Sequence, residues 1–531
     1  MKRRDFLKRA VPVSTLPFMV GGLSMRAYGR SPFLDALLAS AAANDRVLVI
    51  VQMNGGNDGL NMVIPLDRYS DLAAARANVL IPEAKVLTLT GSTTTGLHPA
   101  MTALRGLYDD GKLVVVQSVS YPSPNFSHFR ATDIWLTGSD YNQTLSTGWM
   151  GRSLDAEYPG FPTGYPNSAM PDPLAIQIGS VVSPGLQGVS GPLGMAVANP
   201  DATYILPGGA DVVPDTPAGH ELTFIRNVAQ QTQVYTTSVK AAYNKVANVA
   251  TYPTSALAGQ LKIVARLIAG GLKTRIYVVN IGGFDTHSSQ VDAANHELGN
   301  HANLLGALSS AIGAFQLDLA ALGAEDRVVG MTFSEFGRRV KSNSSGGTDH
   351  GTAVPVFVWG KHVRGGVLGT SPVLRTTTGT LKDNLDMQFD FRNLYADLIR
   401  DWLGSSQSQI QAVLGTPRFT PSTTPMGIVA PAAIADVSDQ GSLPSTYRLN
   451  QNYPNPFNPT TEVRFELPES SHVTLEVFNS AGQHVETLVE GDRPAGIHTA
   501  RFDAKGLSSG VYFCRLRAGS FADTRKMLLV R

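Results

Sequence analysis

Apolar residues along the first 405 positions form continuous runs that are separated by helix-patterned stretches. The runs cover residues 46–53, 112–120, 275–280, 327–334 and 355–360. Strands that are buried on both faces of a sheet have this pattern. After residue 300, six apolar side chains recur at helical spacing: Leu304, Leu305, Leu308, Ile312, Phe315 and Leu319. Strands alternating with helices predict an α/β domain over residues 45–405, with a mostly parallel sheet flanked by helices.

The pattern changes to a period of two near the carboxyl end. Val463, Phe465 and Leu467 alternate with polar residues, and a similar alternation follows at 473–477. Residues 447–531 are therefore predicted to form a small all-β sandwich. The stretch 416–446 is rich in Pro, Thr, Ala and Ser without periodicity and is predicted to be a linker. Residues 139–215, rich in Gly, Pro, Ser and Asn, are predicted to be loops or a cap around the site, and 217–271 to be helical.

The amino terminus has the features of an export signal. A basic start is followed by a moderately apolar run over 10–25 and by small residues near Ala27. Within it, Arg3-Arg4-Asp5-Phe6-Leu7-Lys8 resembles a twin-arginine signal, which implies export in the folded state through the twin-arginine translocase. An ordinary secretory signal is the alternative. We take 1–30 as the signal peptide.

Composition and charge exclude several classes of function. The formal net charge of +1 gives no reason to expect a nucleic-acid partner. Dinucleotide-binding and P-loop motifs are absent from the sequence. No apolar run after the signal approaches the roughly 20 residues of a bilayer span, so no transmembrane span is expected in the mature chain. The single cysteine, Cys514, excludes an intramolecular disulfide.

Polar side chains gather where the predicted strands end. Asp285 and His287 follow a Gly282-Gly283 turn after the 275–280 strand. The other polar groups at strand ends lie in the loop 54–61, at Ser127-His128, at Glu335 and at Asp349-His350. Ligands of open α/β sheets bind at the carboxyl ends of the strands, so we expect these groups to converge.

Carboxylates and imidazoles in such a position predict a site for divalent metal ions. In this interpretation Asp285, His287 and His350 hold one ion, and Asp58 and Glu335 hold a second. Zinc, magnesium, manganese and calcium all remain open. Ser127 is the predicted nucleophile, with its hydroxyl deprotonated by a metal rather than by a base residue.

Three arginines are candidates for binding an anionic group of a substrate: Arg338, Arg130 and Arg152. The alternative for each is a salt bridge at the base of a loop. His296 and His301 are five residues apart and do not share one helix face, so we expect them to be solvated or to support ligands rather than to be ligands. A Ser-His-Asp triad is not supported, because adjacent Ser127 and His128 rarely contact each other and no Gly-x-Ser-x-Gly elbow is present.

Residues 45–405 resemble the bacterial domain-of-unknown-function family 1501. Six motifs carry the resemblance, at 54–61, 125–129, 147–152, 283–287, 334–338 and 347–351. That family is similar to the alkaline phosphatase/sulfatase superfamily, which implies a metal-dependent hydrolase fold for phosphate or sulfate esters. By this resemblance Asp285, His287 and His350 match one metal site, and Ser127 matches the nucleophile, followed by a Thr137-Gly138 pair seen in sulfatases.

The chain departs from the superfamily pattern at two places. Asn54 stands where an aspartate is expected after the first strand, with Asp58 as a substitute. Glu335-Phe336 stands where Asp-His is expected after a later strand. These departures reduce the number of ligands available for a second metal ion.

Residues 447–531 resemble the C-terminal sorting domain of the type IX (Por) secretion system, through the motifs at 452–459 and 510–513. The resemblance implies the type IX secretion machinery as a partner, and transit through the periplasm to the cell surface or the extracellular space. The sequence thus predicts an exported metal-dependent hydrolase of phosphate or sulfate esters. The alternative is a non-catalytic surface protein that keeps the fold and binds envelope polysaccharide or acts in assembly, which Asn54 and Phe336 favour.

Overall fold

The computed structural model describes residues 45–201, 235–429 and 447–530, except for scattered positions, together with the short pair β1 (Phe18–Val20) and β2 (Leu23–Met25). The chain divides into two compact units, Met1–Ala435 and Asp436–Arg531. Apart from that antiparallel pair, the predicted twin-arginine signal lies outside the described residues, and so does the stretch 430–446.

A nine-stranded mixed sheet forms the centre of the first unit. The five apolar runs become β3 (Val47–Met53), β7 (Leu113–Ser120), β10 (Ile276–Ile281), β11 (Val328–Phe333) and β14 (Val354–Trp359). The sheet order is β15-β7-β14-β11-β3-β10-β8-β9, with β16 (Phe389–Asp390) also paired to β7 and with β15 spanning Gly366–Leu368. β11, β3, β10 and β8 run parallel, while β14 is antiparallel to both neighbours. The predicted α/β class with a mostly parallel sheet is confirmed.

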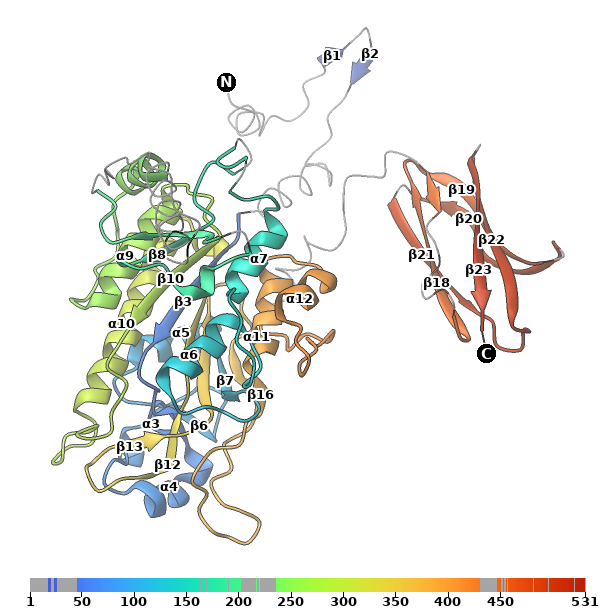
Figure 1. Cartoon of the computed structure of the whole chain (residues 1–531). Coiled ribbons are helices and arrows are strands. Elements are labelled where there is room, and N and C mark those ends of the chain that lie inside the picture. Colours follow the sequence, from blue (N-terminus) through green and yellow to red (C-terminus); the bar gives the residue numbers. More distant parts are fainter. Residues whose placement is uncertain are drawn as a thin grey trace. The chain divides into compact units, whose positions relative to one another are not determined.

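Helices cover both faces of this sheet (Figure 1). One face packs against α5 (Thr102–Asp109), α9 (Ala256–Ala269) and α10 (Asn300–Ala321). The other packs against α6 (His128–Thr137), α7 (Trp149–Glu157), α11 (Phe391–Asp397), its π-helical continuation Leu398–Trp402, and α12 (Gln407–Leu414). Within β3, Val49 and Val51 belong to the first core, and Leu48 and Ile50 to the second. This alternation explains why the strand is apolar throughout.

The helix α10 is longer and more apolar than the sequence analysis allowed. Its 22 residues pass the length and composition test for a membrane span, so the statement that no later run approaches that length was wrong. Most of its apolar window is nevertheless buried inside the protein, where Leu305, Leu308 and Ile312 pack in the first core. Burial against the sheet accounts for the composition of a core helix.

Parts of the predicted loop region 139–215 and of the predicted linker 416–446 belong to the core. β8 (Ala175–Ile178) and β9 (Gly194–Val197) extend the sheet beyond β10, and α7 also lies in the predicted loop region. In the predicted linker, Ile428 and Val429 are buried in the second core. Short apolar segments among Gly and Pro do not show from their own sequence that they are buried, because distant segments cover them.

Smaller elements lie beyond the carboxyl ends of β3 and β11. The loop after β3 leads into α3 (Gly59–Met62), the small sheet of β4 (Val63–Pro65), β5 (Leu87–Thr88) and β6 (Thr95–Leu97), and α4 (Tyr69–Arg76). The hairpin of β12 (Arg338–Ser342) and β13 (Thr348–His350) follows β11. These elements carry the polar groups that the sequence places at strand ends.

The second unit consists of two antiparallel sheets around one apolar core. One sheet contains β17 (Arg448–Leu449), β18 (Thr460–Leu467) and β21 (Gly496–Asp503). The other contains β19 (Ser471–Asn479), β20 (His484–Arg493), β22 (Gly510–Ala518) and β23 (Phe521–Leu529). Val463, Phe465 and Leu467 lie in the core, as the period of two predicts.

Candidate metal centre

Close contact between two loops fixes the position of Asp285. The Asn54 backbone donates to Ile281 at the end of β10, and Phe284 donates back to Asn54, at 2.9 and 3.1 Å. Gly55 lies between them with a φ of +123°, and a Cβ on it would come within 2.3 Å of the Asp285 nitrogen. Only glycine fits this conformation and this spacing. The loops after β3 and β10 are thereby locked together with Asp285 at their junction.

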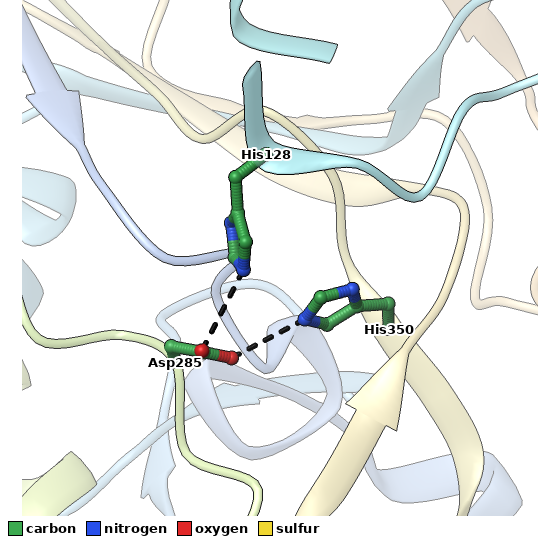
Figure 2. A group of neighbouring side chains, drawn as sticks. All are labelled: His128, Asp285 and His350. Atoms are coloured by element: carbon green, nitrogen blue, oxygen red, sulfur yellow. Dashed lines mark hydrogen bonds and ion pairs between the residues drawn. The ribbon is translucent and has the colours of Figure 1, made fainter. Parts of the chain in front are cut away.

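Three imidazoles converge on the Asp285 carboxylate. The Nε2 atoms of His287 and His350 lie 3.2 and 3.3 Å from Asp285 Oδ1, and His128 Nε2 lies 3.6 Å from Oδ2. The Nε2 atoms of His287 and His350 are 2.9 Å apart. Figure 2 shows His128, Asp285 and His350 pointing toward one another from three different segments. The predicted grouping of Asp285, His287 and His350 is therefore present in the structure, and His128 joins it.

Each of the three imidazoles is oriented through its other nitrogen. Nδ1 of His128 lies 2.8 Å from Glu335 Oε1, Nδ1 of His287 lies 3.1 Å from Asp349 Oδ1, and Nδ1 of His350 lies 2.8 Å from the Phe126 carbonyl. A carbonyl or carboxylate oxygen only accepts, so each Nδ1 donates a proton. In a neutral ring Nε2 then presents its lone pair to the site. Metal-bound histidines in proteins are held in this way.

The ligand atoms of His128, Asp285 and His350, which all lie within 4.8 Å of one another, fit one small cation, and His287 Nε2 lies beside them. Bonds of about 2.0–2.1 Å in a tetrahedral site place ligand atoms about 3.3–3.4 Å apart, close to the distances around Asp285. Without a positive charge between them, three lone pairs and a carboxylate would repel one another. The side chains of Asp285 and His287 are 48% and 45% exposed, so the centre is open to solvent on one side. An open centre leaves room for a substrate group.

The charges around the centre favour an ionised Asp285 carboxylate and a neutral His350 ring. Partial burial alone would raise the pKa of Asp285, but its hydrogen bond from Arg338 and its contact with His350 hold it below its usual value. Burial lowers the pKa of His350, and its contacts with the Phe126 carbonyl and Asp285 offset only part of that effect. Both shifts favour the protonation states that bind a metal.

The structure places Asp58 away from this centre. Its carboxylate is 1% exposed and receives Arg76 Nη1 at 2.8 and 2.7 Å and Gln290 Nε2 at 2.6 Å. It also caps α3 by accepting from the Leu60 backbone. Burial would raise the pKa of Asp58, but Arg76 lowers it below its usual value. We therefore remove Asp58 from the predicted second metal site.

Glu335 also differs from its predicted role. Its Oε1 accepts from the Gly55 backbone at 2.9 Å and contacts His128 Nδ1, while Oε2 accepts from the Ser334 hydroxyl at 3.2 Å. The side chain is almost fully buried. Glu335 thus faces the outer nitrogen of His128 rather than the space between the Nε2 atoms. In this geometry it orients a ligand.

The predicted anion-binding role of Arg338 is wrong. Its side chain has no exposed surface and donates to the carbonyls of Gly56, Thr348 and Phe284 at 2.6, 2.8 and 3.1 Å, and to Gly55. The remaining contact is an ion pair with Asp285 Oδ1 at 2.6 Å. Because every guanidinium nitrogen already has a protein acceptor, Arg338 holds the loops of the centre together.

Arg130 and Arg152 are also committed to the protein. Arg130 pairs with Asp133 and donates to the carbonyls at 140, 141 and 143. Arg152 donates to the carbonyls of Thr137, Thr147 and Val413, and burial lowers its pKa to about 10. The stated alternative, a salt bridge, is observed for Arg130 and Arg338, whereas Arg152 is bound by carbonyls.

Ser127 lies at the N-cap of α6, one residue before His128. It is exposed, and its hydroxyl makes no capping bond and has no other hydrogen-bond partner within the described residues. Its backbone nitrogen donates to Asn125 Oδ1 at 2.8 Å. The hydroxyl is therefore free to contact a bound molecule beside His128.

A buried hydrogen-bond network around Gln290 joins the segment that carries Asp285 and His287 to the segment that carries His350. Gln290 Oε1 accepts from the hydroxyls of Thr286 and Thr348 at 3.1 and 2.8 Å, and its Nε2 donates to Asp58. Thr286 stands between Asp285 and His287, and Thr348 starts the β13 strand that ends in His350. The Asp58–Arg76 pair thus supports the centre through Gln290.

His301 is buried rather than solvated. Its Nε2 lies 2.9 Å from Asn57 Oδ1, and its ring contacts Phe284 and His98 edge-on. This agrees with the supporting role that was one of the two expectations for it. His296 is half-buried, and its Nδ1 lies 2.9 Å from the Leu80 carbonyl.

His128 is the residue that the sequence analysis missed. The sequence places it among the polar groups expected to converge at the strand ends, but the predicted metal ligands do not include it. The available signal was its place at the carboxyl end of β7, the same edge that was used to select Asp285, His287 and His350.

The described part of the chain is thus an α/β unit with a candidate metal centre, followed by a β-sandwich. Residues 222–416 match the model of a protein family of unknown function, DUF1501. Residues 451–530 match the secretion system C-terminal sorting domain. The family resemblance is confirmed over residues 222–416 and the sorting-domain resemblance over 451–530, and the sorting domain indicates export to the cell surface or the extracellular space.

Several solved structures are similar to the chain at low identity. The phosphonate monoester hydrolase of Silicibacter pomeroyi is 10% identical over 91% of this chain and 88% of that one, with a TM-score of 0.29. A sulfatase of Pseudoalteromonas is 9% identical over 90% and 89%, with a TM-score of 0.29. PorZ, a surface component of the type-IX secretion system of Porphyromonas gingivalis, is 15% identical over 19% of this chain and 14% of that one, with a TM-score of 0.13. No curated protein matches the chain.

Proposed function

We propose that this protein is an exported metal-dependent hydrolase of phosphate or sulfate esters. The observation that carries the proposal is the convergence of three oriented Nε2 atoms on the exposed carboxylate of Asp285. Its position at the carboxyl ends of the strands is where open α/β sheets bind ligands. The motifs shared with the DUF1501 family, and that family's similarity to the alkaline phosphatase/sulfatase superfamily, support the choice of ester.

A divalent ion at the centre supplies positive charge for the anionic oxygens of the ester and for the attacking group. The protein contributes Ser127, whose unpaired hydroxyl stands next to the ligand His128. The amino-terminal end of α6 carries partial positive charge and favours an anionic group beside Ser127. With Arg338, Arg130 and Arg152 committed to carbonyls, these features replace an arginine clamp in binding the ester.

Replacement of Ser127 by alanine tests the proposal. We expect the purified full chain to hydrolyse at least one aryl phosphate monoester, phosphate diester or sulfate ester, and Ser127→Ala to lower kcat/KM by at least about a thousandfold. The physical reason is the loss of the hydroxyl that the proposal assigns as the attacking group. Release of the aryl alcohol, followed by absorbance, measures the effect.

Ser180→Ala is the matched control, because Ser180 is another exposed serine beyond the carboxyl end of a sheet strand. It should retain the wild-type rate. A metal-loaded wild-type chain that cleaves none of these esters, or equal rates for Ser127→Ala and the wild type, would exclude serine-based hydrolysis.

A second candidate function follows from the arginines, because none of the three candidates is available to bind an anionic ester. Asp58 and the three arginines are all used inside the protein, and Phe336 stands where a ligand is expected. A surface protein that keeps one metal and binds envelope polysaccharide, or acts in assembly, needs none of them. Metal binding without turnover, together with retention on a polysaccharide column, would select this candidate.

For the route of export we propose the twin-arginine translocase followed by the type IX machinery, with the periplasm as an intermediate location. The proposed divisions are a signal at 1–30, the α/β domain at 45–405, a linker within 416–446 and the sorting domain at 447–531. The Arg3-Arg4 pair and the sorting-domain match support this order. Replacement of both arginines by lysine should trap the chain in the cytoplasm if the first step is correct.

A further inference from the structure

We infer that the centre is a single-ion site, selective for a nitrogen-preferring divalent metal of the zinc type, with His128 as a ligand. This rests on the metal-binding part of the proposed function. The observation behind it is the kind of atoms that face one another. Two imidazole nitrogens, from His128 and His350, face the Asp285 carboxylate, and the Nε2 atom of His287 lies 3.2 Å from that carboxylate. Imidazole suits zinc and its transition-metal neighbours, whereas magnesium and calcium require mostly oxygen ligands.

The other carboxylates near the centre are withdrawn from the metal position. Glu335 Oε1 is occupied by His128 Nδ1 and the Gly55 nitrogen. Asp349 Oδ1 is occupied by His287 Nδ1 and by Asn343 Nδ2 at 3.1 Å. Calcium takes about six to eight oxygen ligands, and magnesium requires six in a near-ideal octahedron. The described residues offer a hard ion one carboxylate, and Arg338 already binds that carboxylate at 2.6 Å.

The ligand His128 has a particularly restrained position. It is held from one side by buried Glu335 and packs against the Phe336 ring with a centroid distance of 4.9 Å. Glu335 is in turn fixed by the glycine loop that positions Asp285. One carboxylate therefore ties the α6 ligand to the β10 ligand. Glu335 is a positioning residue that sets the direction of the His128 lone pair.

The test measures metal binding rather than turnover. The full chain is stripped with a chelator and titrated with Zn²⁺, Mg²⁺ and Ca²⁺ by calorimetry. We expect one Zn²⁺ per chain, bound more tightly than Mg²⁺ or Ca²⁺ by over about a hundredfold. Co²⁺ in place of zinc should give the intense visible absorption of a four- or five-coordinate ion. Equal affinity for Ca²⁺ or Mg²⁺, two zinc ions per chain, or the weak spectrum of six-coordinate Co²⁺ would overturn the inference.

Two variants assign the residues. Glu335→Gln should lower zinc affinity by about 10–100-fold while one ion still binds, and His128→Gln should lower it further. The matched control is His362→Gln, because His362 also contacts a carboxylate, Asp326 at 3.1 Å. Unchanged zinc affinity in His128→Gln would remove His128 from the site. Zinc binding as expected without any ester hydrolysis would refute the proposed function and leave this inference standing.

Discussion

Replacement of Asp58 by alanine is expected to lower the free energy of unfolding of the α/β unit by about 3–5 kcal/mol. The side chains of Asp58 and Arg76 are 1% and 0% exposed and form two contacts of 2.8 and 2.7 Å. The variant leaves the Arg76 cation buried without its counterion, which is more costly than never having had the pair. Urea unfolding followed by tryptophan fluorescence measures the loss. All four tryptophans, at 135, 149, 359 and 402, lie in the α/β unit.

Two comparisons distinguish the loss of this buried ion pair from a nonspecific loss of stability. Asp383→Ala removes an exposed ion pair with Lys341 and should leave the free energy of unfolding close to that of the wild type. The double variant Asp58→Leu with Arg76→Leu removes both charges and should recover part of the stability lost in the single variant. The number of metal ions bound under native conditions should stay the same in Asp58→Ala. A variant of wild-type stability that has lost one ion would return Asp58 to the metal site.

The sequence predicts those features that depend on a local hydrophobic pattern or on the position of a residue at the end of a strand. Continuous apolar runs located β3, β7, β10, β11 and β14, because a strand covered on both faces must be apolar on both sides. The carboxyl ends of parallel strands meet at one edge, so the sequence alone groups Asp285, His287 and His350, and the structure brings them together. Both inferences need only the order of the elements.

The roles of the charged residues were not predictable in this way. A buried arginine and an anion-binding arginine look alike in the sequence. Arg338 is structural because the loops carrying Gly56, Phe284 and Thr348 turn their carbonyls toward it. Asp58 has the right residue type and the right position after β3, yet its partner Arg76 comes from α4. His128 faces Asp285, and its ring is oriented by Glu335 from 207 positions away. Such partners are set by packing between distant segments, which local pattern does not encode.

Acidification from pH 7 to pH 5 is expected to destabilise the α/β unit by about 2 kcal/mol for each of His98 and His301. Burial lowers the pKa of His98 to about 3 and that of His301 to about 4. His98 faces His301 and Asp58, and His301 also faces Arg76 and Arg338. In the unfolded chain both rings titrate near 6.5. Between pH 6.5 and pH 4 the unfolded state therefore binds more protons than the folded one, and the folded state loses stability as the pH falls.

Urea unfolding of the metal-free chain at several pH values measures this slope, and a His98→Leu variant isolates one of the two contributions. The variant should lose the His98 contribution of about 2 kcal/mol, whereas His362→Gln should keep the wild-type slope. Asp58 does not contribute in this window. Its pKa is depressed, so its stabilisation is lost only as the pH falls below its unfolded value of 3.8. Equal stability of the wild type at pH 7 and pH 5 would mean that both buried rings accept a proton without cost. Such a result would contradict the structure of the described residues. His98 Nε2 and His301 Nδ1 have no hydrogen-bond partner there, and the two residues are 1% and 0% exposed, so a protonated ring would have no acceptor for the added proton.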